Sequence, residues 1–167
     1  MKPIIVLFIL WLTCSWNGYS QRSIRFTCDT LNGTTVFLLK SEKWLRPTSD
    51  LLLTFEREGQ KQMVKDFQTL LQRAFPDVSE EDYTYLKKVI WYVYVFPDGT
   101  CKHDYFMMPL TTVEHFPDIE SSLSVLVNEI ERIDFKKYKM SYMDPATKDK
   151  CLYRGGFSFM LLKQKVE

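Results

Sequence analysis

The feature that most constrains the fold is an apolar and aromatic run at residues 89–96, which reads VIWYVYVF. Its length is typical of a strand, its residues are mainly β-branched or aromatic, and both of its faces are apolar. We expect such a strand in the middle of a sheet, with a cover on each side. Pro97-Asp98-Gly99 then predicts a turn. The chain returns over residues 100–108 as a partner strand, with one face formed by Cys101, His103, Tyr105 and Met107.

Two segments have the apolar spacing of helices. Residues 58–74 and 117–133 each place apolar side chains three and four positions apart, and Pro76 ends the first pattern. Ser79 and Asp82 have the spacing of a capping box at the start of a short helical turn. The two stripes are expected to pack against the sheet, and they consist of Met63, Phe67, Leu70, Leu71 and Ala74 in one helix and Ile119, Leu123, Val127 and Ile130 in the other.

The N-terminal part of the chain predicts a hairpin. Residues 22–30 and 34–40 alternate as strands do, and Asn32-Gly33 lies between them. Asn-Gly tolerates the positive φ angles of a type I′ turn, which joins two antiparallel strands through two residues. Residues 41–55 can be strand or loop, and a buried strand at 51–55 is one reading of this region.

The C-terminal part predicts two further strands, at residues 135–143 and 152–163. Gly155-Gly156 inside the last one predicts a bulge or a kink, because glycine in a strand interior often marks one. Phe157, Phe159 and Leu161 are expected to share a face of that strand. Together these patterns predict an α+β fold: a largely antiparallel sheet with two main helices packed on it, in a single domain that covers residues 21–167.

Residues 1–20 have the pattern of a cleavable signal peptide. Lys2 precedes the apolar run 4–12, and the small residues Gly18 and Ser20 place the expected cleavage before Gln21. The run is too short to span a bilayer, which takes about 20 residues. We therefore expect an exported protein, periplasmic or extracellular. The alternatives are a membrane anchor, a buried core helix, and lipid attachment at Cys14, which would make the protein an outer-membrane lipoprotein.

Composition excludes several classes of partner. The chain has 22 basic and 21 acidic residues, and like charges form no block, so nothing indicates binding to nucleic acid. After the signal segment no apolar run is long enough to cross a membrane. Three cysteines remain there, Cys28, Cys101 and Cys151, so at most one intramolecular disulfide can form and one thiol is left over. The pairing among them stays open.

No motif for catalysis, cofactor binding or metal binding is present. The two histidines, His103 and His115, have no metal-ligand spacing, and there is no Cys-x-x-Cys pair. A cysteine nucleophile needs a histidine base nearby, and Cys101 and His103 lie two residues apart on one strand. A cysteine-dependent enzyme at this pair is therefore one alternative function. We predict no catalytic, cofactor-binding or metal-binding residue otherwise, and no cofactor.

The unit at residues 88–163 resembles a known family. A hairpin with the turn Pro97-Asp98-Gly99-Thr100 is followed by the helix at 117–133 and by the aromatic strand Phe157-Ser158-Phe159. This order is similar to the C-terminal periplasmic domain of TonB-type energy transducers. The signal segment and the overall size resemble uncharacterised secreted proteins of Gram-negative bacteria.

The resemblance implies a function without catalysis. We expect an exported, periplasmic or surface-associated interaction module that is not an enzyme, and that binds another envelope protein by strand addition, most naturally at the final strand. A structural envelope component held by lipid at Cys14 is a further alternative. The ligand and the oligomeric state are left open by the sequence.

Overall fold

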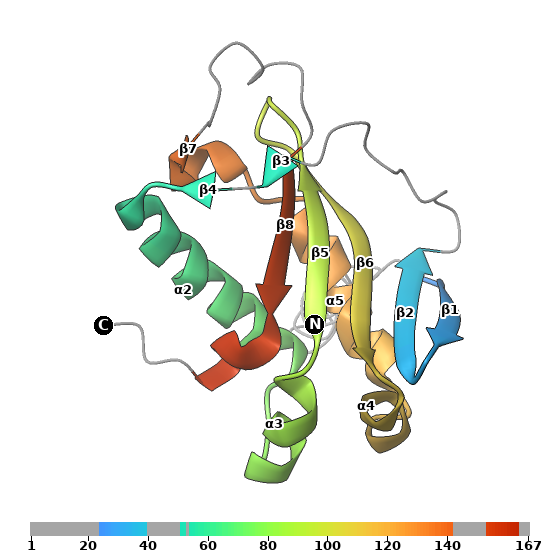
Figure 1. The fold of residues 1–167 in the computed structure, drawn as a ribbon. Coiled ribbons are helices and arrows are strands. Elements are labelled where there is room, and N and C mark those ends of the chain that lie inside the picture. The colour runs from blue at the N-terminus through green and yellow to red at the C-terminus, as the bar shows by residue number, and fades with distance from the viewer. Residues whose placement is uncertain (1–23, 40–50, 53, 142–152, 164–167) are drawn as a thin grey trace, which may run out of the picture.

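The structure is a computed structural model that describes residues 24–39, 51–52, 54–141 and 153–163. It has the α+β architecture that the sequence predicts (Figure 1). The strands are β1 Phe26–Leu31, β2 Thr34–Leu39, β3 Leu51–Leu52, β4 Thr54–Phe55, β5 Ile90–Val95, β6 Cys101–Pro109, β7 Met140–Ser141 and β8 Tyr153–Ser158. The helices are α2 Arg57–Ala74, α3 Glu80–Leu86, α4 Leu110–His115 and α5 Ile119–Ile130, with 3-10 turns η1 Phe135–Tyr138 and η2 Phe159–Lys163. The expected signal segment lies outside the described residues.

The main sheet has the strand order β1-β2-β6-β5-β8-β3. All neighbouring pairs are antiparallel except β3 and β8, which are parallel. The predicted central strand is confirmed, because β5 lies between β6 and β8. A second, two-stranded sheet pairs β4 with β7. The segment 51–55, which can be strand or loop by its sequence, contributes one short strand to each sheet.

The N-terminal hairpin forms as predicted. Its two strands are in register from Phe26 with Leu39 to Leu31 with Thr34. Asn32 and Gly33 have φ angles of 51° and 76°, as a type I′ turn requires at both central positions. The hairpin is joined to the rest of the sheet by the pairing of β2 with β6 (Figure 1).

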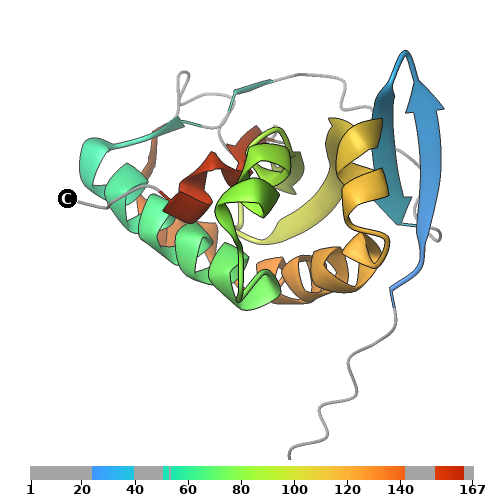
Figure 2. The same cartoon turned by 90° about the horizontal axis from the view of Figure 1, so that it is seen from below.

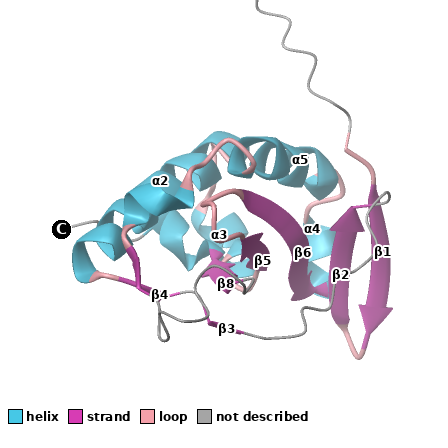
Figure 3. Ribbon diagram, turned by 90° about the horizontal axis from the view of Figure 1, so that it is seen from above, coloured by secondary structure: helices cyan, strands magenta, loops and turns pink. Residues whose placement is uncertain are grey.

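Helices α2 and α5 pack on one face of the main sheet (Figure 3). The predicted stripes are buried in both helices, and Phe67, Leu123 and Ile130 are each fully buried. The side chains of β5 that face these helices are Trp91, Val93 and Val95, also fully buried. The expected cover on the second face is not provided by a helix in the described part of the chain, and Tyr92 there is half-buried.

Two shorter helices lie at one end of the sheet, α3 before β5 and α4 after β6 (Figure 2). The predicted capping box at the start of α3 is confirmed. The Ser79 hydroxyl accepts a hydrogen bond from the Asp82 N–H at 3.1 Å, and the Asp82 carboxylate accepts one from the Ser79 N–H at 3.0 Å. The Ser79 hydroxyl also donates a hydrogen bond to the Asp82 carboxylate at 2.6 Å, and this bond, with those from His115 and the Ser79 N–H, lowers the pKa of Asp82 to about 2.

The side chains of β6 do not lie on the faces that the sequence predicts. Tyr92 pairs with Tyr105 and Val93 pairs with His103, so Asp104 is an extra residue without a partner in β5. Such a bulge reverses the alternation of side chains that follows it. Cys101 and His103 therefore face the helices, whereas Tyr105 and Met107 lie on the opposite face, and the prediction that all four share one face is wrong.

The predicted C-terminal strands also differ from the structure. Most of the segment 135–143 is not a strand: η1 covers Phe135–Tyr138, and only the short β7 follows it. The reason is that Phe135 and Tyr138 are both fully buried three residues apart, which suits a 3-10 turn and not a strand. The last strand ends at Ser158, and η2 replaces its expected continuation, so that Leu162 is buried and Leu161 is only half-buried.

Candidate binding groove beside the last strand

One edge of the main sheet is open along the second half of β8. On this edge β3 pairs only with Tyr153 and Arg154. The Phe159 N–H donates to the Val89 carbonyl at 3.1 Å, and because bonded residues alternate in an antiparallel pair, Gly155 and Phe157 bond to β5. Gly156 consequently directs its backbone N–H and C=O groups to the other edge, and Ser158 directs its N–H there, whereas the Ser158 carbonyl accepts the first hydrogen bond of η2. Among the described residues, no strand pairs with them there.

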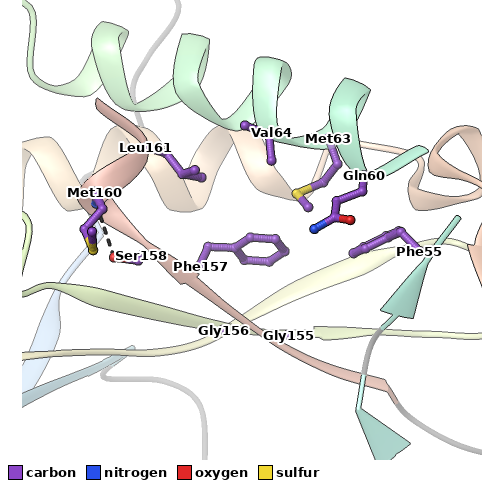
Figure 4. A pocket seen from close by; sticks show the side chains of 10 residues that line it. All are labelled: Phe55, Gln60, Met63, Val64, Gly155, Gly156, Phe157, Ser158, Met160 and Leu161. Atoms are coloured by element: carbon purple, nitrogen blue, oxygen red, sulfur yellow. Dashed lines mark hydrogen bonds between the residues drawn. The ribbon is translucent and has the colours of Figure 1, made fainter. Parts of the chain in front are cut away.

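A groove of about 340 Å³ runs beside this open edge (Figure 4). Helix α2 forms one wall, with Val64, Met63 and Gln60 pointing toward β8. The Phe157 ring lies between the strand and the helix, and Phe55 from β4 closes one end. The groove is lined by Phe55, Gln60, Met63, Val64, Gly155, Gly156, Phe157, Ser158, Met160 and Leu161. It therefore combines free backbone groups with a mainly apolar lining.

The two glycines of β8 lie in regular pairing with β5. They do not form the bulge that their sequence predicts, because Gly155 and Gly156 pair in regular register with Val93 and Tyr92. A Cβ atom added at Gly156 would lie 3.2 Å from the Tyr92 ring, so the tyrosine fills the space that a side chain would otherwise occupy. The strand therefore keeps its regular pairing to β5 through both glycines.

The start of β8 is fixed by a polar cluster on the sheet face opposite the helices. The Arg154 guanidinium lies 3.4 Å from the Asp104 carboxylate and donates a hydrogen bond to the Tyr105 hydroxyl. It also stacks 4.6 Å from the centre of the Tyr92 ring. Burial raises the pKa of Asp104 to about 6, although the nearby Arg154 lowers it. The cluster ties β8 to β6 across β5, and so holds the open edge in place.

The pair Cys101 and His103 lies in the core. Burial raises the pKa of the Cys101 thiol far above its usual value, so the nucleophilic thiolate does not form at neutral pH. Burial also lowers the pKa of His103 to about 3, and its Nδ1 atom accepts a hydrogen bond from the Trp91 indole at 2.9 Å. In this environment the imidazole is a neutral core residue, and a substrate cannot reach either group.

The remaining histidine is also in a structural contact. His115 Nε2 lies 2.8 Å from the Asp82 carboxylate, and its ring stacks on Tyr85 with the centroids 4.0 Å apart. These contacts join α4 to α3. Within the described ranges, no three histidine, cysteine, aspartate or glutamate residues are arranged to hold a metal ion. In the same part of the chain, no helix has the length and apolar character needed to cross a membrane.

Comparisons with known proteins give no relative for this chain. No family model matches it, and no curated protein or solved structure shows significant similarity to it. The resemblance of residues 88–163 to the C-terminal domain of TonB-type transducers stays a prediction. The unit itself contains more than a hairpin, a helix and a strand, since α4, η1 and β7 are also part of it.

The sequence indicated the last strand as a docking position, but it did not indicate the groove. Phe55, Gln60 and Val64 had no assigned role, because a groove wall combines residues from β4, α2, β8 and η2. One signal was available. Val64 lies beside the buried stripe of α2 and is only half-buried, and such a flanking apolar residue marks where a helix borders an unfilled surface.

Proposed function

We propose that this protein is an exported, non-enzymatic interaction module that binds an extended peptide segment of another envelope protein along the edge of β8. The observation that carries this proposal is the open edge at Gly156 and Ser158, which lies beside the apolar groove. An extended segment of a partner chain carries N–H and C=O groups that can pair with the free backbone groups of this edge. Strand addition therefore satisfies both chains at once.

The groove gives such an interaction its specificity. Side chains of an added strand alternate between the two faces of the sheet, so every second one points toward α2. An apolar side chain there would contact Val64, Met63 and Phe157. The Gln60 side chain is exposed at the rim, where its amide can bond to a polar neighbour. The expected partner segment therefore alternates apolar and polar residues.

The absence of catalysis is part of the proposal and rests on chemistry. A binding groove for a strand needs main-chain groups and apolar contacts, and the lining of this one includes no ionisable side chain. General acid–base or nucleophilic catalysis needs a titratable or nucleophilic group at the bound substrate. Ser158 is the one hydroxyl in the lining, and its oxygen accepts a hydrogen bond from the Met160 N–H at 3.2 Å.

The proposal is tested with a synthetic peptide of alternating valine and threonine residues. We expect it to bind the purified protein and to lose affinity by about tenfold or more in the variant Val64→Gln, because the apolar contact with its valine side chain is weakened. Lys65→Gln is the matched control, since Lys65 is the neighbouring exposed residue and does not line the groove. Isothermal titration calorimetry measures both affinities.

Two N-methylated peptides separate strand addition from plain apolar binding. Methylation of alternate amides on the edge that faces β8 removes the N–H that bonds to the Gly156 carbonyl and places a methyl group against the edge, and we expect binding to be lost. Methylation of the other alternate amides leaves that bond in place, so binding persists. If both methylated peptides bind equally well, or if no alternating peptide binds, strand addition at β8 is wrong.

Export of this module rests on the N-terminal segment. Mass spectrometry of the mature protein made in a Gram-negative host is expected to find Gln21 as the first residue, because Ser20 precedes the predicted cleavage position. A mature chain that begins with lipid-modified Cys14 would instead establish the lipid-anchored alternative. An uncleaved Met1 start on protein found in the cytosol would contradict export.

A further inference from the structure

The other edge of the main sheet, formed by β1, is also open. Leu31 and Thr34 flank the two-residue turn and form a bonded pair, so the alternate residues Asp29 and Thr27 also bond to β2. Phe26, Cys28 and Thr30 therefore direct their backbone N–H and C=O groups away from the sheet. The Thr30 N–H shows this direction, because it donates to the carboxylate of its own neighbour Asp29 at 2.9 Å. Among the described residues, no strand pairs with β1 on this side.

Among the described residues, this edge has one protection against pairing with another chain, the Asp29 carboxylate that accepts a hydrogen bond from the Thr30 N–H. Edge strands are commonly blunted by lysine, proline, a bulge or a covering element. β1 reads FTCDTL, contains neither lysine nor proline, and keeps regular register with β2 over its whole length. Its single charge is Asp29. In three views of the molecule β1 is the outermost strand, and no described element covers it (Figures 1, 2 and 3).

The outward residues of β1 can pair with the outward residues of β1 in a second copy of the chain. In an antiparallel pair of two copies, a register centred on Cys28 places Phe26 opposite Thr30 of the second copy, and Cys28 opposite Cys28. This is the register in which all three outward residues meet outward residues, and each opposing pair can then exchange both of its hydrogen bonds, the Thr30 N–H leaving the Asp29 carboxylate to bond to Phe26 of the second copy. Asp29 lies opposite Thr27 in this arrangement, so no two like charges face each other across the strands.

The thiols at the centre of that register are within reach of each other. Bonded residues across an antiparallel pair have Cα atoms about 5.5 Å apart, and a disulfide accepts about 4.4–6.8 Å. Cys28 is exposed and is a free thiol. Cys101 is fully enclosed in the core, and lies on β6, which β2 separates from β1. Cys28 therefore has no partner in Cys101, Cys151 lies outside the described residues, and a second copy of the chain brings an equivalent thiol to Cys28.

We propose that two copies of this protein pair through β1 in the antiparallel register centred on Cys28, and that a disulfide between the two Cys28 residues can lock the pair. The sheet then continues from one copy into the other, and the two β8 grooves lie at its far ends. Each Cys28 thiol gives up a proton and an electron as the S–S bond forms. An added disulfide, such as oxidised glutathione, accepts both electrons and both protons and leaves as two thiols.

The neighbourhood of Cys28 sets how fast the lock forms. Partial burial raises the pKa of the thiol, and the carboxylates of Glu120 on α5 and Asp29 on β1 raise it further, while a hydrogen bond with Thr30 lowers it. The thiolate is the species that attacks a disulfide. Locking is therefore expected to speed up as pH rises toward the raised pKa of Cys28.

The test treats the purified chain with oxidised glutathione and follows the covalent dimer on non-reducing gels. We expect a dimer in the wild-type chain and in the matched control Cys101→Ser, and none in Cys28→Ser. Thr30→Pro removes an outward N–H without removing a bond to β2, so the dimer should form about tenfold more slowly because paired hydrogen bonds are lost. Thr30→Val keeps the N–H and, like the proline variant, loses the hydroxyl bond that lowers the pKa of Cys28, so it isolates the backbone effect and should dimerise faster than Thr30→Pro.

A second measurement does not depend on any variant. Hydrogen exchange of the reduced protein at high and low concentration should show slower exchange at Phe26, Cys28 and Thr30 when the protein is concentrated. The proposal is overturned if no covalent dimer forms, if the dimer survives Cys28→Ser, if Thr30→Pro and Thr30→Val dimerise at the same rate, or if exchange at β1 is independent of concentration.

Discussion

The variant Phe67→Ala is expected to lower the free energy of unfolding by about 4 kcal/mol, since a fully buried phenylalanine loses its apolar burial and leaves a cavity. Phe67 on α2 stacks on Phe157 of β8 with the ring centroids 4.0 Å apart and the planes 25° apart. It also lies 5.8 Å from the Trp91 ring and 6.1 Å from the Phe135 ring. One side chain thus joins the helix to two strands and to η1. Urea unfolding followed by circular dichroism measures the loss.

Phe67→Leu is the control for this variant. Leucine keeps most of the apolar volume, so we expect it to lose clearly less stability than alanine does. Because Phe157 lines the groove, Phe67→Ala should also weaken binding of the alternating peptide even at temperatures where the variant is folded. A loss of less than about 1 kcal/mol would mean that α2 is not packed on β8 as described here.

The variant Gly59→Ala is expected to lower the free energy of unfolding by about 3 kcal/mol, although alanine is the better helix former by about 1 kcal/mol. A Cβ atom at position 59 would lie 1.6 Å from the Tyr138 carbonyl oxygen and 2.4 Å from its carbonyl carbon. Both atoms belong to the backbone, so η1 must move away from α2. That movement also strains the hydrogen bond from the Glu56 N–H to the Lys139 carbonyl, at 3.1 Å.

The exposed helix position Gln62 provides the control for Gly59. Gln62→Ala introduces the same residue three positions later in α2, where the exposed side chain donates a hydrogen bond to Asp66 at 2.7 Å, and losing this i,i+4 bond should change stability by less than about 0.5 kcal/mol. Thermal unfolding of both variants gives the comparison. If Gly59→Ala is as stable as the wild type, the close approach of η1 to the first turns of α2 is contradicted.

Local signals predicted those parts of the fold in which neighbours along the chain decide the structure. The Asn32-Gly33 turn, the cap at Ser79 and the stripe that contains Phe67 each depend on residues within one turn or one helix. The interactions that form these three features involve only residues that are close in the sequence. The α+β class followed from them, because two amphipathic helices and several strands leave few other ways to bury their apolar faces.

The predictions that failed concern features whose structure is set by contacts between residues far apart in the sequence. Strict alternation along β6 gave one face to Cys101 and Tyr105, but the bulge at Asp104 depends on the carboxylate's position near Arg154, fifty residues later in the chain. Gly155 and Gly156 suggested a bulge, although the cross-strand neighbour Tyr92 supplies the missing side-chain volume and keeps the pairing regular. The groove has the same origin, since its walls come from α2 and β8, which lie far apart in the chain.

The central claim is that the open edge of β8 receives an extended peptide, and amide NMR tests it most directly. During titration with the alternating valine–threonine peptide, the N–H signals of Gly156 and Ser158 should shift most and become protected from exchange. Signals of Gly155 and Phe157, whose N–H groups already bond to β5, should move less. Shifts centred on Cys28 and Thr30 of β1, or no shifts in β8 at saturating peptide, would contradict the account.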